Sequence, residues 1–596
     1  MVYIPQGGFF AGDNATSTSA FRQGSSDNDP WWIESEAAIS VTNSAGSGTG
    51  VRPEKAAEYY YVSGGNVGED ATGAAFTIPA AFPKGYQGFY MMKGEISQAQ
   101  WVNFFNTLTS TQKTTRDVTS GSAATNVWTG KGTDGLLNRN NVSWTSGDAT
   151  LPDQGGGARY EGVAMNFIHW GDVTAYLDWA GLRPMSELEF ERAGRGPYRA
   201  VSGEYAWGST SITGVTSITN GGLSNEAPGN AANCVYNNTT GGPMRVGAMA
   251  YGDSTRIASG AGYYGVMDLS GNGWERCVTV GNSTGRAFEG RYHGNGSLDN
   301  SGNPNVSTWP GTTGGAGYRG GAWEYAFWAN LSNRTYAAYY TPEPRHNSRA
   351  SRGVRTAPLW NPSQLSTALW LDAADSSTVT TVSGAVSQWN DKSGNARNVS
   401  QATVASRPTY TTAGLNGLNV VTFDGSNDSI SNSTYTFPTV YSIYAVGRNS
   451  NTGYSRLLNV GVVDTFGFFG SNSSNYATFF GNGVTWNDVA ANTPAQSVTS
   501  TSILGLVKDN TVGGAIPYVN GTAQNTKSGT TASTTGFILG GAMSQQWNGI
   551  VAELIILPVL STTTQRQQIE GYLAWKWGLQ ANLNVSHPYY KNPPPR

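Results

Sequence analysis

The sequence predicts a mostly β protein with some α-helix, organised as two domains. At 596 residues the chain is too long for one ordinary hydrophobic core. Charged residues make up 13% of it, about half the usual share of roughly 25%, whereas Gly (78), Trp (19) and Tyr (30) are abundant. This composition is typical of loop-rich, β-rich proteins of the extracellular or virion type.

Charge and cysteine content exclude several classes of function. A net charge of −3 gives no electrostatic footprint for nucleic acid or for an anionic membrane. No stretch approaches the roughly 18 apolar residues of a membrane span, and the start "MVYIPQGGFFAGD" lacks the pattern of a signal peptide. We therefore expect a mature fragment, or a chain that reaches the outside by assembly into a particle. Cys234 and Cys277 lie in no CxxC pattern, so they pair once or not at all.

The elements of the first domain follow from local patterns. Residues 1–12 alternate in β fashion, and residues 88–108 read as a strand followed by an amphipathic helix with Ser97 as N-cap. A second helix is expected to stop at Gly181, and a third to begin at the capping box formed by Ser186 and Glu189. The stretch "RGGAWEYAFWAN", residues 319–330, reads as a strand that starts on a Gly-Gly kink.

The pattern changes after residues 356–366, which we take as the boundary region. We expect domains at 1–358 and 367–596, joined by a linker at 359–366. "LNVVTFDG" and "GIVAELIIL" are typical of strands that bury one face in a β-sandwich. A final helix is expected over residues 564–579, with four apolar side chains toward the sheets: Ile569, Leu573, Trp575 and Trp577.

Seven motifs in the first domain carry a family resemblance. They are "VYIPQGGFFAG", "EISQAQWVNFF", "WAGLRPMSELEFERAGRG", "YAWGS", "GYYGVMDLSGNGWE", "YRGGAW" and "SRASRGVR". Their order resembles the formylglycine-generating-enzyme-like (sulfatase-modifying factor) family, whose fold is a variant of the C-type lectin fold. The resemblance implies a C-type-lectin-like α+β domain over residues 1–358.

The catalytic residues of that family are replaced in this chain. Counting from Gly320 and Gly321, the two cysteines that bind copper in the oxygen-dependent enzymes fall on Tyr325 and Asn330, which cannot act as thiolates. Related iron-dependent sulfoxide synthases need a His-rich helical domain, and the four histidines here are scattered. We expect a relative that keeps the fold and is not an enzyme. An enzyme of the formylglycine-generating or sulfoxide-synthase type is the alternative.

Residues 319–355 also resemble the C-terminal segment of variable proteins that retroelements diversify, which display changeable residues on this lectin fold. The resemblance implies a ligand face of rings and small amides. Nine residues make up this expected face: Tyr325, Phe327, Asn330, Asn333, Tyr336, Tyr339, Tyr340, His346 and Asn347. Trp323, next to the Gly-Gly kink, is expected in the core. Arg319, Arg334, Arg345 and Arg355 are expected to form scaffold ion pairs.

The family also carries calcium near its "GN-x-W-E" motif, which implies a structural Ca²⁺ here. The matching residues are Asn272 and Glu275, with Asp268 nearby. Oxygen ligands of this kind suit calcium. The other interpretation is that Asn272 caps a turn and Glu275 pairs with an arginine.

The second domain resembles the concanavalin A-like, laminin-G-type jelly roll often appended to phage and bacterial surface proteins. The resemblance covers residues 365–590 and is strongest in "FDGSNDSI" and "IEGYLAWKWGLQANLNVSHPYY". Asp424, Asn427 and Asp428 could hold calcium in such a module, and a turn made by Asx residues explains them equally well. Glycosidases use a pair of carboxylates, and no such pair with a motif around it stands out in this sequence.

Taken together, the sequence predicts a binding or display protein of a phage or virus particle, such as a receptor-binding, tail-fibre or capsid decoration protein. The expected partners are a host-surface glycan or protein receptor, other virion proteins and a second copy of the chain in a homo-oligomer. The expected location is the virion surface, or alternatively a bacterial cell surface or the secreted fraction. A purely structural virion component without a ligand is the remaining alternative.

Overall fold

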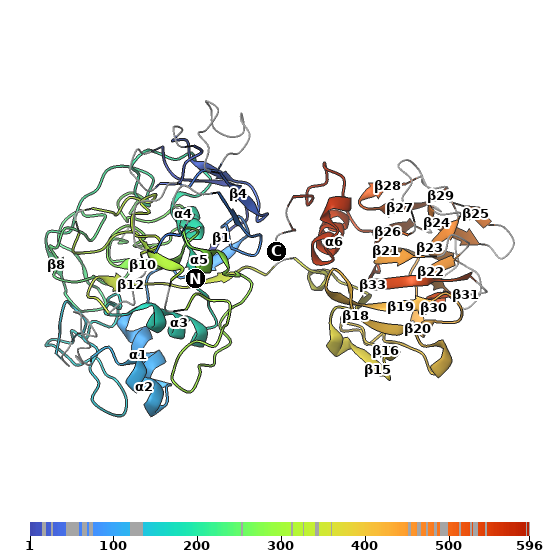
Figure 1. The fold of residues 1–596 in the computed structure, drawn as a ribbon, viewed down its shortest axis with the longest axis horizontal. Helices are drawn as coiled ribbons and strands as arrows, with labels where there is room; N and C mark the ends of the chain where they lie inside the picture. The colour runs from blue at the N-terminus through green and yellow to red at the C-terminus, as the bar shows by residue number, and fades with distance from the viewer. Residues whose placement is uncertain are drawn as a thin grey trace. The chain divides into compact units, whose positions relative to one another are not determined.

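The computed structural model divides the chain into two compact units, Met1–Ala357 and Pro358–Arg596. Figure 1 shows both as mostly β with some α, which confirms the predicted fold class. The structure describes these residues: 1–14, 20–24, 28–42, 59–61, 68–70, 75–119, 131, 135–251, 254–311, 314–325, 327–339, 345–358, 360–450, 455–461, 466–472, 475–481, 486–488, 497, 499–509, 511, 514–524, 527–528, 534–542, 545–591 and 593–594.

Short strands and helices, joined by long irregular segments, build the first unit. In chain order they are β1 (Val2–Ile4), β2 (Phe9–Ala11), β3 (Trp31–Ile33), β4 (Ile39–Val41), β5 (Phe76–Ile78), β6 (Phe89–Met91), α1 (Gln98–Asn106), α2 (Ser110–Arg116), α3 (Trp170–Trp179), β7 (Met185–Ser186), α4 (Glu187–Arg195), β8 (Ile218–Thr219), β9 (Ala227–Pro228), β10 (Trp274–Val278), α5 (Ser283–Arg286), β11 (Ala316–Arg319), β12 (Arg349–Ala350) and β13 (Val354–Thr356). One sheet has the order β1-β6-β13, and a second has the order β11-β10-β12 with β7 paired to β10.

Local capping chemistry starts the helices where the sequence predicts. Ser97 caps α1 and Ser186 caps α4, each in a complete capping box. The second expected helix is α3, which begins after His169, and Gly181 follows it with a positive φ of 67°. Helix α2 was not predicted, because its sequence STQKTTR has no apolar period, although a Thr109 capping box starts it.

The sheet β11-β10-β12 corrects the prediction for residues 319–330. Strand β11 ends at Arg319, before the Gly-Gly pair, and the residues described after it form turns. Gly320 and Gly321 have φ of 88° and 72°, values outside the extended region, so the strand cannot continue through them. The aromatic side chains that follow are therefore held on a loop over the sheet and not in the sheet.

Buried ion pairs hold this loop and the end of β11 in place. Helix α4 presents Glu187 and Glu191, and Arg319 contacts these carboxylates at 3.1 and 2.6 Å. Arg334 contacts Glu187 at 2.6 Å, and Arg345 contacts Asp172 at 2.7 Å. Three of the four predicted scaffold arginines are thus confirmed in buried ion pairs. The fourth, Arg355, is exposed and donates to the carbonyl of Gly181.

The second unit is an antiparallel β-sandwich closed by a helix. Its elements are η1 (Pro362–Gln364), β14 (Leu369–Asp372), η2 (Ser376–Thr378), β15 (Val379–Val382), β16 (Ala385–Trp389), β17 (Val399–Ser400), η3 (Val404–Ser406), β18 (Thr409–Leu415), β19 (Leu418–Asp424), β20 (Ile430–Thr436), β21 (Val440–Asn449), β22 (Ser455–Val460), β23 (Phe466–Asn472), β24 (Asn475–Gly481), β25 (Trp486–Asp488), β26 (Ser502–Asp509), β27 (Gly514–Val519), β28 (Thr522–Ala523), β29 (Lys527–Ser528), β30 (Thr535–Leu539), β31 (Gly541–Ala542), β32 (Gln545–Gln546), β33 (Asn548–Leu557), α6 (Thr563–Lys576) and η4 (Gln580–Asn582). Strand β33 is central, because it pairs with β14, β19 and β21.

Alternation along β33 separates two cores. Leu554 and Ile556 point into the core between the sheets, whereas Ile555 and Leu557 pack on the other side, under α6. Of the four side chains expected on the inner face of α6, Ile569, Leu573 and Trp577 are fully buried and Trp575 is partly buried. The segment expected as a linker contributes to this second core, since Trp360 is buried in it. Pro362–Gln364 of the same segment forms η1.

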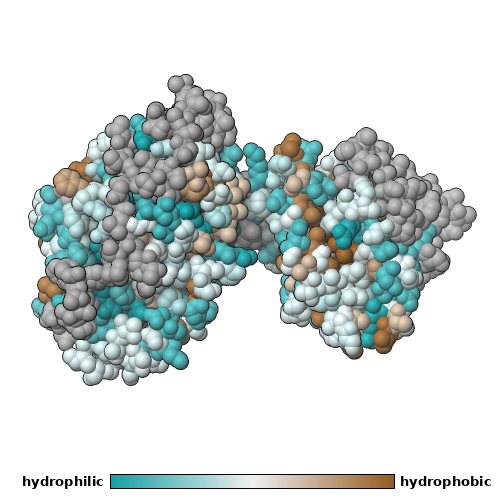
Figure 2. Space-filling view, viewed as in Figure 1, coloured by the Kyte–Doolittle hydropathy of each residue, from teal (hydrophilic) through white to brown (hydrophobic). Residues whose placement is uncertain are grey.

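The visible surface is a mixture of hydrophilic, neutral and hydrophobic residues (Figure 2). On the face shown in Figure 2, hydrophobic atoms lie in small scattered groups among hydrophilic and neutral ones. Within the described part of the chain, no helix has both the length and the apolar character needed to cross a bilayer.

Candidate functional site

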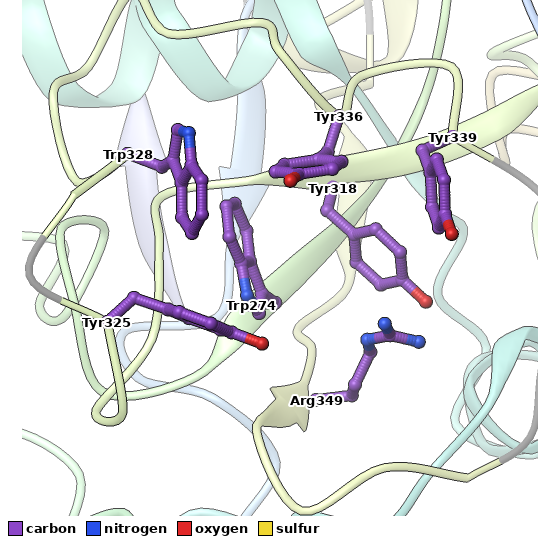
Figure 3. Close-up of a pocket in the computed structure, with 7 residues that line it drawn as sticks. All are labelled: Trp274, Tyr318, Tyr325, Trp328, Tyr336, Tyr339 and Arg349. Atoms are coloured by element: carbon purple, nitrogen blue, oxygen red, sulfur yellow. The ribbon is translucent and has the colours of Figure 1, made fainter. Parts of the chain in front are cut away.

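Seven side chains in the first unit surround a pocket of about 180 Å³. We call it the aromatic pocket. Its lining consists of six aromatic rings and one guanidinium: Trp274, Tyr318, Tyr325, Trp328, Tyr336, Tyr339 and Arg349 (Figure 3). Its lining mixes ring faces with hydroxyl and guanidinium groups, and a concave site that combines aromatic side chains with a few convergent polar groups is a candidate small-ligand site.

The sheet β11-β10-β12 supplies the base of the pocket. Trp274 is the first residue of β10 and lies opposite Arg349 of β12, while Arg276 of β10 lies opposite Tyr318 of β11. Side chains alternate along a strand, so Trp274 and Arg276 share one face of β10 and Glu275 lies on the other. The register of three strands thus brings together residues that are far apart in the chain.

The loop after β11 supplies the remaining rings, and its conformation depends on positive φ angles. Gly321 approaches the backbone of Ala329 so closely that an added Cβ would lie 3.0 Å from its nitrogen. Trp328 itself has a φ of 70°, an uncommon value for a bulky residue. Such a conformation persists only where the surrounding structure holds it, and it places the Trp328 ring in the pocket wall.

Trp274 is the central ring. Its centroid lies 6.1 Å from Tyr318, 6.0 Å from Tyr325, 6.1 Å from Trp328 and 5.5 Å from Tyr336. Neighbouring rings in the wall meet edge to face, with Trp328 and Tyr336 at 5.3 Å and an interplanar angle of 80°. Edge-to-face pairs are favourable for aromatic rings and keep them in fixed orientations. The wall is therefore built before any ligand arrives.

One end of the pocket is electropositive. The guanidinium carbons of Arg276 and Arg349 lie 4.0 and 4.3 Å from the centroid of the Tyr318 ring. Tyr318 is 3% exposed, and its hydroxyl oxygen is buried with no hydrogen-bond partner in the part of the chain that the structure describes. In Figure 3 this hydroxyl and that of Tyr339 lie on the side of the Arg349 guanidinium.

Among the seven residues that line the pocket, Arg349 carries the charge at neutral pH. Burial, together with the neighbouring Glu324, raises the pKa of the Tyr325 hydroxyl. Burial and the positive charge of Arg349 lower the pKa of His346 to about 4. Glu324 Oε1 lies 3.9 Å from His346 Nδ1. Glu324 and His346 do not line the pocket.

The structure separates the nine residues expected on the ligand face into three groups. Tyr325, Tyr336 and Tyr339 line the pocket. Five others lie elsewhere or are used by the fold: Phe327, 68% exposed; Asn330, which donates to Gly203 O; Asn333, which accepts from Thr335 N; His346, beside Ser348; and Asn347, whose carbonyl accepts from the Trp323 indole. Tyr340 lies outside the described residues.

Four lining residues were not predicted: Trp274, Tyr318, Trp328 and Arg349. Two of them, Trp274 and Tyr318, lie on strands that the motifs "GNGWE" and "YRGGAW" mark, and period-2 alternation separates their face from that of Glu275 and Arg319. That alternation can be read from the sequence. The pairing of β10 with both β11 and β12 cannot be read from it, because the pairing joins distant segments of the chain.

The residues expected to bind calcium are engaged by protein donors. Glu275 accepts from Arg352 Nε at 2.7 Å through both oxygens, and Asn272 Oδ1 accepts from Met244 N at 2.8 Å. Asp268 accepts from Gly247 N at 2.6 Å. Among the described residues no group of three or more His, Cys, Asp or Glu could hold a metal. Protein donors thus occupy at least one oxygen of each expected ligand, and a structural Ca²⁺ at this site stays a prediction.

The Asp424 loop of the second unit forms an Asx turn. Asp424 Oδ1 accepts from the backbone N–H groups of Ser426 at 2.8 Å, Asn427 at 3.2 Å and Asp428 at 3.4 Å. Asp428 Oδ2 accepts from Asp424 N at 2.9 Å. The turn interpretation accounts for these acidic residues.

Neither cysteine has the environment of a reactive thiol. Cys234 and Cys277 are free and buried, and burial raises the pKa of each thiol. Reactive cysteines have the opposite property, a lowered pKa in an accessible site. Tyr325 lines the pocket at one of the two positions where the resemblance places a catalytic cysteine.

Comparison with solved structures finds similarity at low identity. The binding domain of Paraclostridial Mosquitocidal Protein 1 is 12% identical, with 35% of this chain and 53% of that chain covered and a TM-score of 0.28. Domain 4 of AbnA, an extracellular arabinanase from Geobacillus stearothermophilus solved with arabinotriose, is 14% identical, with 33% and 95% covered and a TM-score of 0.26. The botulinum neurotoxin serotype D binding domain is 10% identical, with 34% and 51% covered and a TM-score of 0.27.

The chain thus spans about half the length of the first and third of these structures. No curated protein matches the chain. The family comparison gives a direct result: the model of the sulfatase-modifying factor enzyme 1-like domain matches residues 49–358, just over half of the chain. This match contains six of the seven motifs of the first unit, and the chain belongs to the sulfatase-modifying factor enzyme 1-like (FGE-sulfatase) family.

Proposed function

We propose that the first unit is a non-catalytic binding domain that holds a glycan in the aromatic pocket. One observation carries the proposal: six rings from two strands and a loop converge, with a guanidinium, on a pocket of about 180 Å³. Within it, Tyr325, Tyr336 and Tyr339 combine an aromatic face with a hydroxyl group.

The chemistry of the lining suits a sugar. A pyranose has an apolar face of C–H groups, which packs on aromatic rings, and a rim of hydroxyls, which exchange hydrogen bonds with tyrosine hydroxyls and with guanidinium N–H groups. Rings already held edge to face lose little side-chain entropy on binding. Tyrosine and tryptophan also dominate binding hot spots for this reason.

The residues at the expected cysteine positions disfavour the enzyme alternative. Phenol and amide groups stand at Tyr325 and Asn330, where the family's cysteines are expected, and neither can bind copper as a thiolate. The two cysteines present are buried with raised pKa values. A copper or iron assay on the purified protein, together with an assay for formylglycine formation, tests this point.

We further propose that the protein acts on a surface exposed to the host, as a receptor-binding, tail-fibre or decoration component of a phage or virus particle. The low charge and the high content of Gly, Trp and Tyr support this setting. Host-surface glycans or protein receptors, other virion proteins and a second copy of the chain are the proposed partners. Fractionation of purified particles, probed with an antibody to the chain, tests the location.

Glycan-array screening followed by calorimetric titration tests binding. We expect Trp328→Ala and Tyr336→Ala to weaken the binding of any glycan hit at least tenfold, because each removes a wall of the pocket. Tyr251→Ala is the matched control, since Tyr251 is 52% exposed and does not line the pocket. A hit that all three variants bind equally well would place the ligand elsewhere. The absence of any hit would leave the structural virion component as the function.

A further inference from the structure

The polar groups of the aromatic pocket are unevenly distributed. Tyr318, Tyr339 and Arg349 lie together at one end, while Tyr325 and Trp328 lie at the other, with Trp274 and Tyr336 between them (Figure 3). A ligand that fills the pocket therefore meets rings along its length and a charged group at one end. Its orientation is decided by what it presents to that end.

The charged end offers hydrogen-bond donors. A guanidinium carries five N–H groups and no acceptor, and Arg349 is the charged residue of the lining. The Tyr318 hydroxyl is buried, and among the described residues it has no hydrogen-bond partner. A buried polar group without a partner destabilises the fold, because its lost hydration is not replaced. A ligand acceptor at this point would remove that cost.

The local charge is positive even when nearby acids are included. Arg276 and Arg349 flank the Tyr318 ring. The acid Glu324 interacts with the Tyr325 hydroxyl at the other end of the pocket and lies 3.9 Å from His346 Nδ1. Burial and Arg349 keep His346 neutral above about pH 4. Arg349 has other interactions within the protein, and its fork of donors can serve more than one acceptor. The end of the pocket is thus suited to an anion that accepts several hydrogen bonds.

We infer that the aromatic pocket binds a sugar that carries a carboxylate, with its ring on Trp274 and its carboxylate at Tyr318 and Arg349. The inference rests on the proposed function and specifies its ligand class. A carboxylate accepts from a guanidinium in two parallel hydrogen bonds, and these charge-assisted bonds are about twice as strong as neutral ones. A neutral sugar presents only hydroxyls to the same donors.

The same geometry argues against a quaternary ammonium, the other usual ligand of an aromatic cage. A cation in this pocket would meet the guanidinium of Arg349 in the wall. None of the seven lining residues is an acid that could offset the repulsion.

Matched probes test the charge preference on the full chain. Methyl glucuronide and methyl glucoside share one ring and differ at C6, where one has a carboxylate and the other a hydroxymethyl group; the galacturonide and galactoside form a second pair. We expect each uronide to bind at least tenfold more tightly than its neutral partner by calorimetric titration. The advantage should shrink at high salt, because added ions screen a partly exposed pair. Choline is the third probe.

Substitutions of Arg349 and Tyr318 test whether these two residues cause the preference for uronides. Arg349→Gln should remove the uronide advantage: it should weaken uronide binding at least tenfold and neutral-sugar binding much less, because the neutral sugar loses only hydrogen bonds between a guanidinium and hydroxyls. Arg349→Lys should restore only part of the advantage, because lysine lacks the planar fork. Tyr318→Phe keeps the ring and should weaken uronide binding severalfold. Circular dichroism of each variant checks that it folds, and Tyr318→Phe carries the test should Arg349→Gln fail to fold.

The outcomes distinguish the inference from the proposed function. Equal binding of uronide and neutral sugar, lost in Trp328→Ala, would overturn the charged ligand and keep the glycan pocket. Tight binding of choline would overturn the carboxylate and make the pocket a cation cage. Failure of every probe, and of every glycan on the array, would overturn the proposed function itself.

Discussion

Trp323 and Phe327 lie close together in the chain and in opposite environments. Trp323 is 3% exposed, packs with Val215, Met244 and Met249, and donates its indole N–H to Asn347 O at 3.1 Å. Phe327 is 68% exposed. The prediction that Trp323 is a core residue is confirmed, and the rings after Gly321 therefore serve different purposes.

This contrast gives a stability prediction. Trp323→Ala removes a buried ring and leaves a cavity, so we expect it to lower the free energy of unfolding of the first unit by about 3 to 5 kcal/mol. Phe327→Ala should change it by less than about 0.5 kcal/mol, because surface substitutions seldom do more. Calorimetric melting of the intact chain measures both. Similar losses in the two variants would show that the loop after Gly321 packs differently.

A cluster of three buried carboxyls around one guanidinium lies on the other face of β10. Glu275 pairs with Arg352, and Glu95 accepts from Asn272 Nδ2 and Gly273 N. Burial raises the pKa of Glu95, Asp268 and Glu275, and the charge of Asp268 raises that of Glu95 further. Over the pH range between the unfolded and the folded pKa values of these acids, the folded chain therefore binds more protons here than the unfolded chain does.

The sign of the resulting pH dependence follows from these raised pKa values. A group whose pKa is higher in the folded state stabilises fully below its unfolded pKa, near 4 for these acids, and loses that contribution as pH rises. We expect Asp268→Asn to raise the melting temperature of the first unit at about pH 8 and to change it little at about pH 4. Asparagine also tolerates the φ of 58° at this position.

Asp148→Asn is the control for that experiment, because its carboxylate is 72% exposed and pairs with Lys113. It should leave the pH dependence unchanged. Identical pH profiles for the two variants would mean that Asp268 ionises normally in the folded protein.

At the scale of elements, two buried carboxylates tie helix α6 to the sandwich: Asp372 of β14 pairs with Lys576 Nζ at 2.6 Å, and Glu553 makes the larger number of contacts. Glu553 of β33 accepts from Trp370 Nε1 at 2.7 Å, Tyr572 Oη at 2.8 Å, Lys576 Nζ at 2.8 Å and Trp577 Nε1 at 2.7 Å. Three of these four donors come from α6 or its C-cap. The apolar contacts of Ile569 and Leu573 bury the helix, and Glu553 selects its rotation and position.

Glu553→Gln should therefore cost about 3 to 5 kcal/mol of stability in the second unit, because an amide nitrogen replaces one acceptor and leaves buried donors facing it. Asp375→Asn is a matched control that alters a partly exposed pair with Lys392, and it should cost no more than about 1 kcal/mol. Calorimetry follows the transition of the second unit in both. A small effect of Glu553→Gln would show that packing alone positions α6.

At the scale of the whole molecule, the boundary between the units has a sharper position than the change in sequence pattern indicates. Trp360 is 3% exposed, its ring meets Tyr572 at 6.1 Å edge to face, and its N–H donates to Pro594 O at 3.2 Å. Residues that precede β14 thus belong to the core under α6. The second compact unit begins at Pro358.

Two fragments test this boundary. We expect residues 358–596 to fold alone, and residues 367–596 to be less stable by about 3 to 5 kcal/mol, because the shorter fragment lacks the buried Trp360 ring. Urea unfolding of both fragments measures the difference. Equal stabilities would show that the segment before β14 is only a connection.

The sequence by itself determined the local features of this protein. The starts of α1 and α4 depend on a side chain and backbone groups a few residues apart, so the capping boxes at Ser97 and Ser186 identify them. The strands of the sandwich and the inner face of α6 follow from apolar periodicity. The order of seven motifs indicates the family.

Only the tertiary structure decided which residues form the aromatic pocket. Trp274, Tyr318 and Arg349 meet because β10 pairs with β11 and β12, and such pairings depend on long-range register, which no local pattern encodes. The same holds for the amides of the expected ligand face. Asn330 and Asn333 look free in the sequence, but backbone groups engage them once the chain folds. A side chain's availability to a ligand depends on which hydrogen bonds the fold has already used.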